Sequence, residues 1–360
     1  MELEHKVGQL MLIGLPGTQA DFATRDLLET IQPGGVLLGN HNIESAQQVA
    51  ELTSTVRSAL KVPPLIAIVQ EGGEHDPLKV IYSPMPSAGR LCESDDASIA
   101  ARLGEITAEA LRTLGFNINF APVLDVSVSE SADNGLRGRC LGSSVANVVR
   151  LAGAYLEGLQ HGGVIGVGKH FPGLGAAKED TGSSLPTIDS SRDELMKRDF
   201  SPYMELFSKI NARLNAVLIG HAHYTAFEGP EPLPASLSKK IITALLRDEL
   251  GFKGLVISDD LGLGAVRAAR DPGEAAVAAV EAGNDMILVA RSAENATSAW
   301  QSLVDAARQE RINPASIRRS FDHIARVKSM LSPPHALTDI TISRLRERIA
   351  ELNMALQQSR

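Results

Sequence analysis

The sequence has few cysteines and few aromatic residues, and it contains no long apolar run. Its 360 residues include two cysteines, Cys92 and Cys140, which lie far apart and without CxxC spacing. We therefore expect neither a disulfide framework nor a cysteine zinc site, and we expect both thiols to be reduced. No apolar run approaches the roughly 18 residues that a membrane-spanning helix needs, so no membrane partner is expected.

Basic residues are also in the minority. The chain has 35 Lys and Arg against 43 Asp and Glu, which gives a formal net charge of −8. This balance offers no basic footprint for nucleic acid or for an anionic membrane surface. The first residues, Met-Glu-Leu-Glu-His-Lys, lack the basic and apolar regions of a signal peptide. We therefore expect a cytoplasmic protein.

Short apolar runs alternate with longer segments of helical periodicity. Strands are predicted at Gln9–Leu15, Gly35–Leu38, Leu65–Gln70, Ile118–Leu124, Val164–Gly168, Ala216–Gly220, Leu255–Ser258 and Met286–Ala290. Helices are predicted near 20–31, 43–60, 97–114, 143–161, 193–210, 238–250, 273–282 and 292–309. This alternation predicts an α/β fold with a parallel sheet, and eight units close a (β/α)₈ TIM-type barrel. A doubly wound open sheet competes, but no GxGxxG follows the first strand.

The domain organisation follows from the interruptions of this pattern. The interval 71–96 is rich in glycine and proline and is predicted to be a long loop at the active face. Residues 1–332 are predicted to form the barrel and 333–360 a helical extension. Leucines and isoleucines in that extension recur at a 3–4 spacing, at Ile342, Leu345, Ile349, Leu352 and Leu356. The stripe indicates a helix docked on the barrel wall; a homodimer seam is the alternative.

Polar residues gather where the predicted strands end. They are Gln70 and Glu71 after the third strand, Asp125 after the fourth, Lys169 and His170 after the fifth, His221 and His223 after the sixth, and Asp259 and Asp260 after the seventh. Strand ends of a barrel converge on one mouth, which is where the active sites of such enzymes lie. Solvent exposure explains any one of these residues but not the whole set.

Several segments resemble those of glycoside hydrolase family 3, in the same order along the chain. The segment Lys169–Gly175, followed by Leu185-Pro186, is similar to its KHFPGHG…LP signature, and Asn119–Asp125 reads NFAPVLD. Gly254–Leu261 resembles the segment with the catalytic nucleophile, and Ala282–Met286 the closing AGxDM. The match is to the short single-domain bacterial β-N-acetylglucosaminidases, which cleave N-acetylglucosamine from cell-wall fragments during peptidoglycan recycling. It implies a carbohydrate substrate, no cofactor and no metal.

The resemblance also implies roles for individual residues. It makes Asp259 the nucleophile of a retaining glycosidase, and Lys169, His170 and Arg139 ligands of the sugar. His221 matches a histidine of the family after the sixth strand and is implied to bind substrate as well. A helix cap is the alternative role for Asp259, a cap or supporting contact is expected of Asp260, and a structural role is expected of Asp125.

The sequence departs from the family at four positions of the same mouth. The histidine that donates the proton, in a mobile loop reading DSH, is replaced by Gly182 in Asp180-Thr181-Gly182. The second histidine of KHFPGHG is Leu174, and the family's DQEGGR reads Val69–Glu74, with valine for aspartate and glutamate for arginine. Asp180, Glu179 or Glu71 is the candidate replacement donor, and Glu71 is otherwise expected to bind substrate. A simple Asx turn is the alternative reading of Asp180.

Three functions remain open on the sequence alone. The first is an active retaining hexosaminidase with an altered proton donor, impaired or changed in its sugar choice. The second is a non-catalytic barrel that binds a sugar, a muropeptide or a protein, with Val69 and Leu174 making the mouth more apolar. The third is a metal-dependent hydrolase, in which His221 and His223 share one face of a strand and bind zinc with His170 and Asp259.

Overall fold

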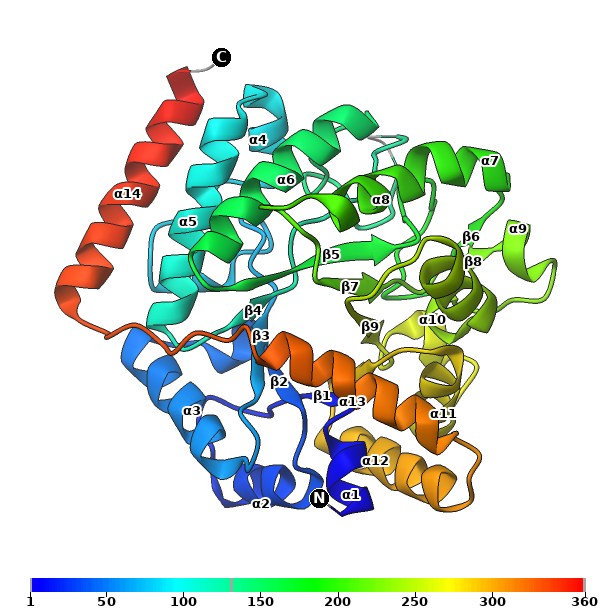
Figure 1. Ribbon diagram of the computed structural model, residues 1–360. Helices are drawn as coiled ribbons and strands as arrows, with labels where there is room; N and C mark the ends of the chain where they lie inside the picture. The colour runs from blue at the N-terminus through cyan, green and yellow to red at the C-terminus, as the bar shows by residue number, and fades with distance from the viewer. Residues whose placement is uncertain (1, 130–131, 359–360) are drawn as a thin grey trace.

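Eight parallel strands close into a barrel in the computed structural model, which describes residues 2–129 and 132–358 (Figure 1). Around the barrel they follow the order β1-β10-β9-β7-β5-β4-β3-β2. The strands are β1 (Met11–Gly14), β2 (Gly35–Leu38), β3 (Leu65–Ile68), β4 (Ile118–Asn119), β5 (Ile165–Phe171), β7 (Ala216–Ile219), β9 (Leu255–Asp260) and β10 (Met286–Val289). The predicted (β/α)₈ barrel is confirmed, and the open sheet is wrong because β1 pairs with both β2 and β10.

Helices surround the strands on the outside of the barrel (Figure 1). The main ones are α2 (Phe22–Ile31), α3 (Ala46–Ala59), α5 (Ala97–Thr113), α6 (Val145–His161), α8 (Ser201–Ser208), the π-helix η5 (Lys240–Glu249), α11 (Pro272–Ala282) and α12 (Ala293–Arg308). Their starts follow the sequence, since Ser45, Ser144 and Ser292 each accept a backbone N–H of the first turn. Gly283 ends α11 in the left-handed conformation.

The strands are apolar because both of their faces are covered. Every residue of β1, β3 and β10 is buried, since one face packs inside the barrel and the other packs under the helices. There is no room for a side chain where the strands approach closely. A Cβ at Gly14 would lie 1.9 Å from the carbonyl oxygen of Ala290. The barrel is therefore a rigid frame for the residues at its mouth.

The ends of β4, β5 and β9 differ from the prediction. β4 ends at Asn119 instead of Leu124, because Pro122 has no N–H for the sheet ladder. β5 continues to Phe171 and β9 to Asp260. Lys169, His170 and Asp259 thus lie within strands and not after them.

Several helical segments were not predicted. The interval 71–96, expected to be a loop, contains the 3₁₀-helix η2 (Pro77–Val80) and α4 (Ala88–Ser94), which Ser87 caps. Helices α1 (Leu3–Gly8) and α13 (Pro314–Lys328) precede and follow the predicted units. The remaining short elements are η1 (Asn40–Asn42), β6 (Thr187–Ile188), α7 (Arg192–Leu195), the π-helix η3 (Met196–Phe200), β8 (His223–Tyr224), α9 (Thr225–Glu228), η4 (Ala235–Leu237) and α10 (Gly264–Arg267).

The C-terminal helix α14 (Asp339–Gln358) packs against α5 and α4 (Figure 1). Its apolar stripe is covered by the same chain: Leu345, Ile349 and Leu352 are 0% exposed and Leu356 is 2% exposed. The predicted docked helix is confirmed. The alternative of a homodimer seam along this stripe is wrong, because the stripe is already buried. The division of the chain at residue 332 stays a prediction.

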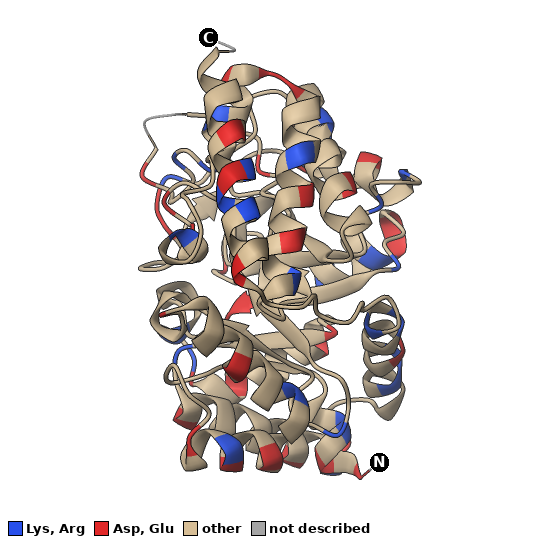
Figure 2. Ribbon diagram, turned by 90° about the vertical axis from the view of Figure 1, so that its left-hand side faces the viewer, with Lys and Arg blue, Asp and Glu red and all other residues tan. Residues whose placement is uncertain are grey.

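Charged residues of both signs are interspersed over the outer helices (Figure 2). In the view of Figure 2, both blue and red segments occur along the outer helices. Within the described parts of the chain, no helix combines the length and the apolar character needed to cross a membrane.

Candidate active site

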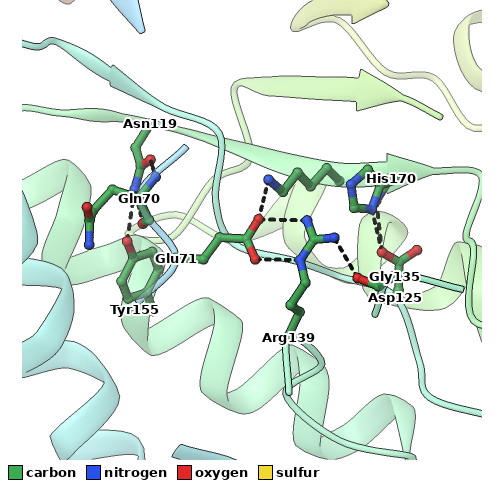
Figure 3. A network of polar contacts seen from close by, with 9 residues as sticks. Gln70, Glu71, Asn119, Asp125, Gly135, Arg139, Tyr155 and His170 are labelled. Carbon is green, nitrogen blue, oxygen red and sulfur yellow. Dashed lines mark hydrogen bonds and ion pairs between the residues drawn. The ribbon is translucent and has the colours of Figure 1, made fainter. Parts of the chain in front are cut away.

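The end of β3 is fixed to β4 by an amide pair. The backbone N–H of Gln70 donates to Asn119 Oδ1 at 2.9 Å, and Asn119 Nδ2 donates to the carbonyl oxygen of Gln70 at 2.9 Å. The Gln70 side chain is buried and donates to Asp76 Oδ1 at 2.8 Å. These bonds set the direction in which the next residue, Glu71, enters the mouth (Figure 3).

Glu71 forms a buried ion cluster with Arg139 and Lys169 (Figure 3). Arg139 donates to both carboxylate oxygens at 2.8 Å, and Lys169 Nζ lies 2.5 Å from Oε1. The side chains of Glu71 and Lys169 are only 5% and 4% exposed. Burial by itself would raise the pKa of Glu71, but the charge of Lys169 and the hydrogen bonds from Arg139 outweigh it and hold that pKa far below its usual range. Glu71 is therefore an ionised partner of two cations, which argues against the predicted role as proton donor.

His170 forms a second pair, with Asp125. Its Nδ1 lies 2.7 Å from Asp125 Oδ2, and the other carboxylate oxygen accepts the backbone N–H of Leu174 at 2.6 Å. The side chain of Asp125 is fully buried and that of His170 is 9% exposed. Asp125, predicted to be structural, holds both the loop after β5 and the imidazole. The peptide bond between Lys169 and His170 is cis.

The loop after β5 packs tightly against the segment that follows β4 and leaves little room for other side chains. A Cβ at Gly175 would lie 1.9 Å from the carbonyl oxygen of Val126, so only glycine fits there. Leu174 is 3% exposed and packs beside Gly220. The expectation that Leu174 makes the mouth more apolar is therefore wrong, although Val69 is half-buried.

Asp259, near the end of β9, is half-buried. Its Oδ1 accepts the backbone N–H of the next residue, Asp260, at 2.8 Å. Its negative charge acts to raise the pKa of both Lys169 and Arg139, which places the carboxylate in the electrostatic field of these two cations. Burial still lowers the pKa of Lys169 overall. Asp259 therefore interacts electrostatically with Lys169 and Arg139, and its role as nucleophile stays a prediction.

Asp260 has other partners than the ion cluster of Glu71, Arg139 and Lys169. It accepts the backbone N–H groups of Gly262 and Ala290 at 3.0 and 3.1 Å and lies 3.2 Å from Arg291 Nε. The predicted supporting contact is confirmed, because these bonds tie β9 to the end of β10.

The loop with Asp180 is docked on the segment that follows β9. The carbonyl oxygens of Thr181 and Gly182 accept the backbone N–H groups of Ala265 and Gly264 at 3.2 and 3.0 Å. Asp180 is exposed, and its carboxylate accepts the N–H of Gly182 at 2.8 Å. This is the Asx turn that was the alternative reading of Asp180.

The histidines after β7 are not arranged to bind a metal. β7 ends at Ile219, so His221 and His223 do not share the face of one strand. His221 is fully buried, with Nδ1 at 2.7 Å from Ser236 Oγ and Nε2 at 3.0 Å from the carbonyl oxygen of Asp260. No group of three or more His, Cys, Asp or Glu side chains in the described residues has the arrangement of a metal site. The premise of the zinc hypothesis is wrong, and His221 has no ring nitrogen left for a sugar.

One buried acid near the site was missed. Asp199, in η3, lies behind the loop after β5: a Cβ at Gly173 would be 2.7 Å from its Oδ1. Its side chain is 0% exposed, and burial raises its pKa to about 6 although Arg198 lies at 2.7 Å. The signal was in the sequence, since Asp199 stands four residues from both Leu195 and Tyr203 on the apolar face of a helix.

The family described as glycosyl hydrolase family 3, N-terminal domain, matches residues 2–327. This chain belongs to glycosyl hydrolase family 3. It is 35% identical over 305 residues to a β-hexosaminidase of Alkalilimnicola ehrlichii, which covers 83% of this chain and 85% of that protein. It is 30% identical over 351 residues to a β-hexosaminidase of Nitrosomonas eutropha, covering 94% and 98% of the two chains. The resemblance inferred from the motifs is confirmed.

Two solved glycosidase structures have the same architecture. A family 3 β-N-acetylglucosaminidase from Paenibacillus superposes with a TM-score of 0.89 at 34% identity, covering 98% of this chain and 69% of that one. A β-N-acetylhexosaminidase from Beutenbergia cavernae gives a TM-score of 0.82 at 28% identity, covering 91% of this chain and 99% of that one.

Proposed function

We propose that this family 3 protein is a retaining β-N-acetylhexosaminidase with Asp259 as its nucleophile. The proposal is supported by Asp259, a half-buried carboxylate near the end of β9 whose charge acts on Lys169 and Arg139. A retaining glycosidase attacks the anomeric carbon with a carboxylate, expels the leaving oxygen and then hydrolyses the covalent glycosyl-enzyme. The family's β-hexosaminidases suggest a substrate with β-linked N-acetylglucosamine, as in cell-wall fragments in the cytoplasm.

The cation cluster retains donors for a sugar although Glu71 occupies part of it. Arg139 uses Nε and one Nη2–H on Glu71 and one Nη1–H on the carbonyl oxygen of Gly135. Lys169 uses one N–H on Glu71. A guanidinium has five donors and an ammonium three, so each side chain keeps two for sugar hydroxyls. Glu71 fixes their directions and is a positioning residue in this proposal.

Gly182 is proposed to stand where related enzymes carry the donating histidine. Without a positioned acid, the rate falls by about 10²–10⁴-fold, and the loss is smaller for a leaving group that needs no proton. We therefore expect hydrolysis of aryl β-glycosides with acidic phenols to be faster than that of natural linkages.

Trapping with a 2-fluoro glycoside tests the nucleophile directly. We expect an intact-mass increase equal to one fluorosugar, which peptide mapping assigns to Asp259, and no increase in Asp259→Ala. Asp180→Ala is the matched control and should still be labelled. Turnover that survives Asp259→Ala would overturn the proposal. A panel of aryl β-glycosides then identifies the sugar.

A non-catalytic sugar-binding barrel is the second candidate, and one observation favours it. Asp180 and Gly182 form a docked turn that offers no histidine, while Glu71 already neutralises much of the charge on the cations. In that case, an N-acetylglucosamine-containing muropeptide raises the melting temperature without being hydrolysed.

A further inference from the structure

A cavity of about 120 Å³ lies at the face of the barrel opposite to the mouth. It is formed by residues shortly before β7 and β9 and by one side of α13, the orange helix in Figure 1 that contacts β9. Gly254 lines this cavity, and Asp259 follows five residues later. At about 3.3 Å per strand residue, the two positions are roughly 16 Å apart. The cavity is therefore separate from the proposed active site.

Three cationic side chains and one histidine line the cavity. Arg213 precedes β7, Lys253 precedes β9, and His323 and Arg326 lie on α13. Among the described residues that line the cavity, none is an Asp or a Glu. Residues from three separate segments thus bring positive charge to one small space that holds no carboxylate, although the whole chain has a net charge of −8.

A buried carboxylate behind His323 is already compensated. Asp285 Oδ1 lies 2.9 Å from His323 Nδ1, while Oδ2 pairs with Arg247. The same Oδ2 accepts the backbone N–H of Val256 at 2.9 Å. Because Arg247 balances the charge of Asp285, that carboxylate leaves the cations of the cavity without a neutralising partner. Its hydrogen bond fixes the imidazole of His323, whose Nε2 points away from Asp285.

The wall of the cavity is apolar and well packed. The rings of Phe207 and Phe252 lie with their centroids 4.5 Å apart. Arg326 Nη1 donates to the carbonyl oxygen of Lys253 at 3.4 Å, which links α13 to the turn before β9. A guanidinium has five N–H donors, so Arg326 keeps four for a ligand. An apolar wall lowers the local dielectric constant and strengthens the attraction between an anion and these cations.

We propose that this cavity binds a phosphate group, either as the free ion or as the end of a small phosphomonoester. It is smaller than the roughly 300–1,000 Å³ of sites for drug-sized molecules, so it accepts a group of few atoms. Three cations match the charge of about −1.5 to −2 that a phosphate monoester carries at pH 7. The guanidinium groups of Arg213 and Arg326 can each bond two oxygens of a tetrahedral anion. The site does not depend on the proposed function.

Calorimetric titration with inorganic phosphate and with glycerol phosphate, in chloride buffers of equal ionic strength, tests the site. We expect saturable binding to wild type, and a rise in Kd of about tenfold or more in both Arg326→Gln and Lys253→Gln, because each loses a charge-assisted hydrogen bond. Arg319→Gln is the matched control: it removes one charge from the exposed side of α13 without touching the cavity, and its Kd should equal that of wild type.

The cations of the mouth, Lys169 and Arg139, are the competing site for the same ion. Phosphate held there would bind equally to wild type, Arg326→Gln and Lys253→Gln, and that result would overturn the proposal, as would the absence of saturable binding to wild type. The substituted side chains are exposed, so the variants should fold, which the urea midpoint checks. Tighter binding of glycerol phosphate than of the free ion would support an esterified ligand, and the reverse order would support inorganic phosphate.

Discussion

Asp180 accepts a hydrogen bond of 2.8 Å from the backbone N–H of Gly182, two residues further along the loop. A side chain at position 182 would therefore begin beside that carboxylate: a Cβ there lies 3.3 Å from Oδ1, and the three nearest atoms all belong to Asp180. One substitution, at Gly182, would therefore be enough to form a histidine–aspartate pair in this turn. The loop carries the carboxylate of such a pair but lacks the imidazole.

Gly182→His should restore a proton donor on the loop. We expect it to raise kcat/KM for a phenyl β-N-acetylglucosaminide by about 10²-fold over the unsubstituted protein, the lower end of what a positioned acid contributes. Gly182→Ala adds the Cβ without the imidazole and should give no gain. Equal values for the histidine and alanine variants would show that the loop does not reach the leaving oxygen.

Glu71→Gln should destabilise the fold more than any exposed charge change. It leaves Lys169 and Arg139 buried without their anion, which typically costs about 3–5 kcal/mol of unfolding free energy. The loss should shrink as pH rises from neutral, because removing Glu71 lowers the pKa of Lys169 further and the buried amine can then lose its proton. Urea unfolding at two pH values measures this.

The exposed neighbour Glu74 is the control for that substitution. Glu74→Gln should leave the urea midpoint almost unchanged, since exposed charges contribute little. If the Glu71 variant were equally stable, the cluster would not be a structural element of the mouth.

The barrel could be predicted from the sequence because both faces of each strand are covered, so that each strand appears as a short apolar run. Lys169, His170 and Asp259 could be predicted because they directly follow predicted apolar strands, and Arg139 because its segment resembles one of the family. The ion pair between Glu71 and Arg139 was not, because its partners are 68 positions apart and only barrel closure brings them together. Helix α4 was missed because the glycines and prolines around it suggest a loop, although Ser87 is a regular cap.

Asp199→Asn should be more stable than wild type at neutral pH, and this advantage should disappear at acidic pH. Burial raises the pKa of Asp199 from 3.8 to about 6, so the folded state binds a proton more tightly than the unfolded state. That contribution to stability is complete below about pH 4 and is lost as pH rises through about 6. The shift corresponds to roughly 3 kcal/mol between these limits. Asparagine has no charge to bury and avoids the loss.

Urea unfolding of Asp199→Asn and wild type at pH 4, 5, 6 and 7 gives the comparison. Asp193→Asn, an exposed position in the same helical segment, should show no such pH dependence. A difference between Asp199→Asn and wild type that is constant with pH would mean that the carboxylate is not titrating in this range.

Leu352→Ala should show that α14 is part of the folding unit and not an appendage. Leu352 is 0% exposed in the contact of α14 with α5 and α4, while Met354, two residues away, is 53% exposed. Truncating a buried leucine costs about 2–5 kcal/mol, so the urea midpoint should fall markedly in Leu352→Ala and stay near wild type in Met354→Ala. The loss should appear in one transition with the barrel, because the stripe is packed on barrel helices. A separate early transition, or equal effects of the two substitutions, would mean that α14 unfolds independently of the barrel.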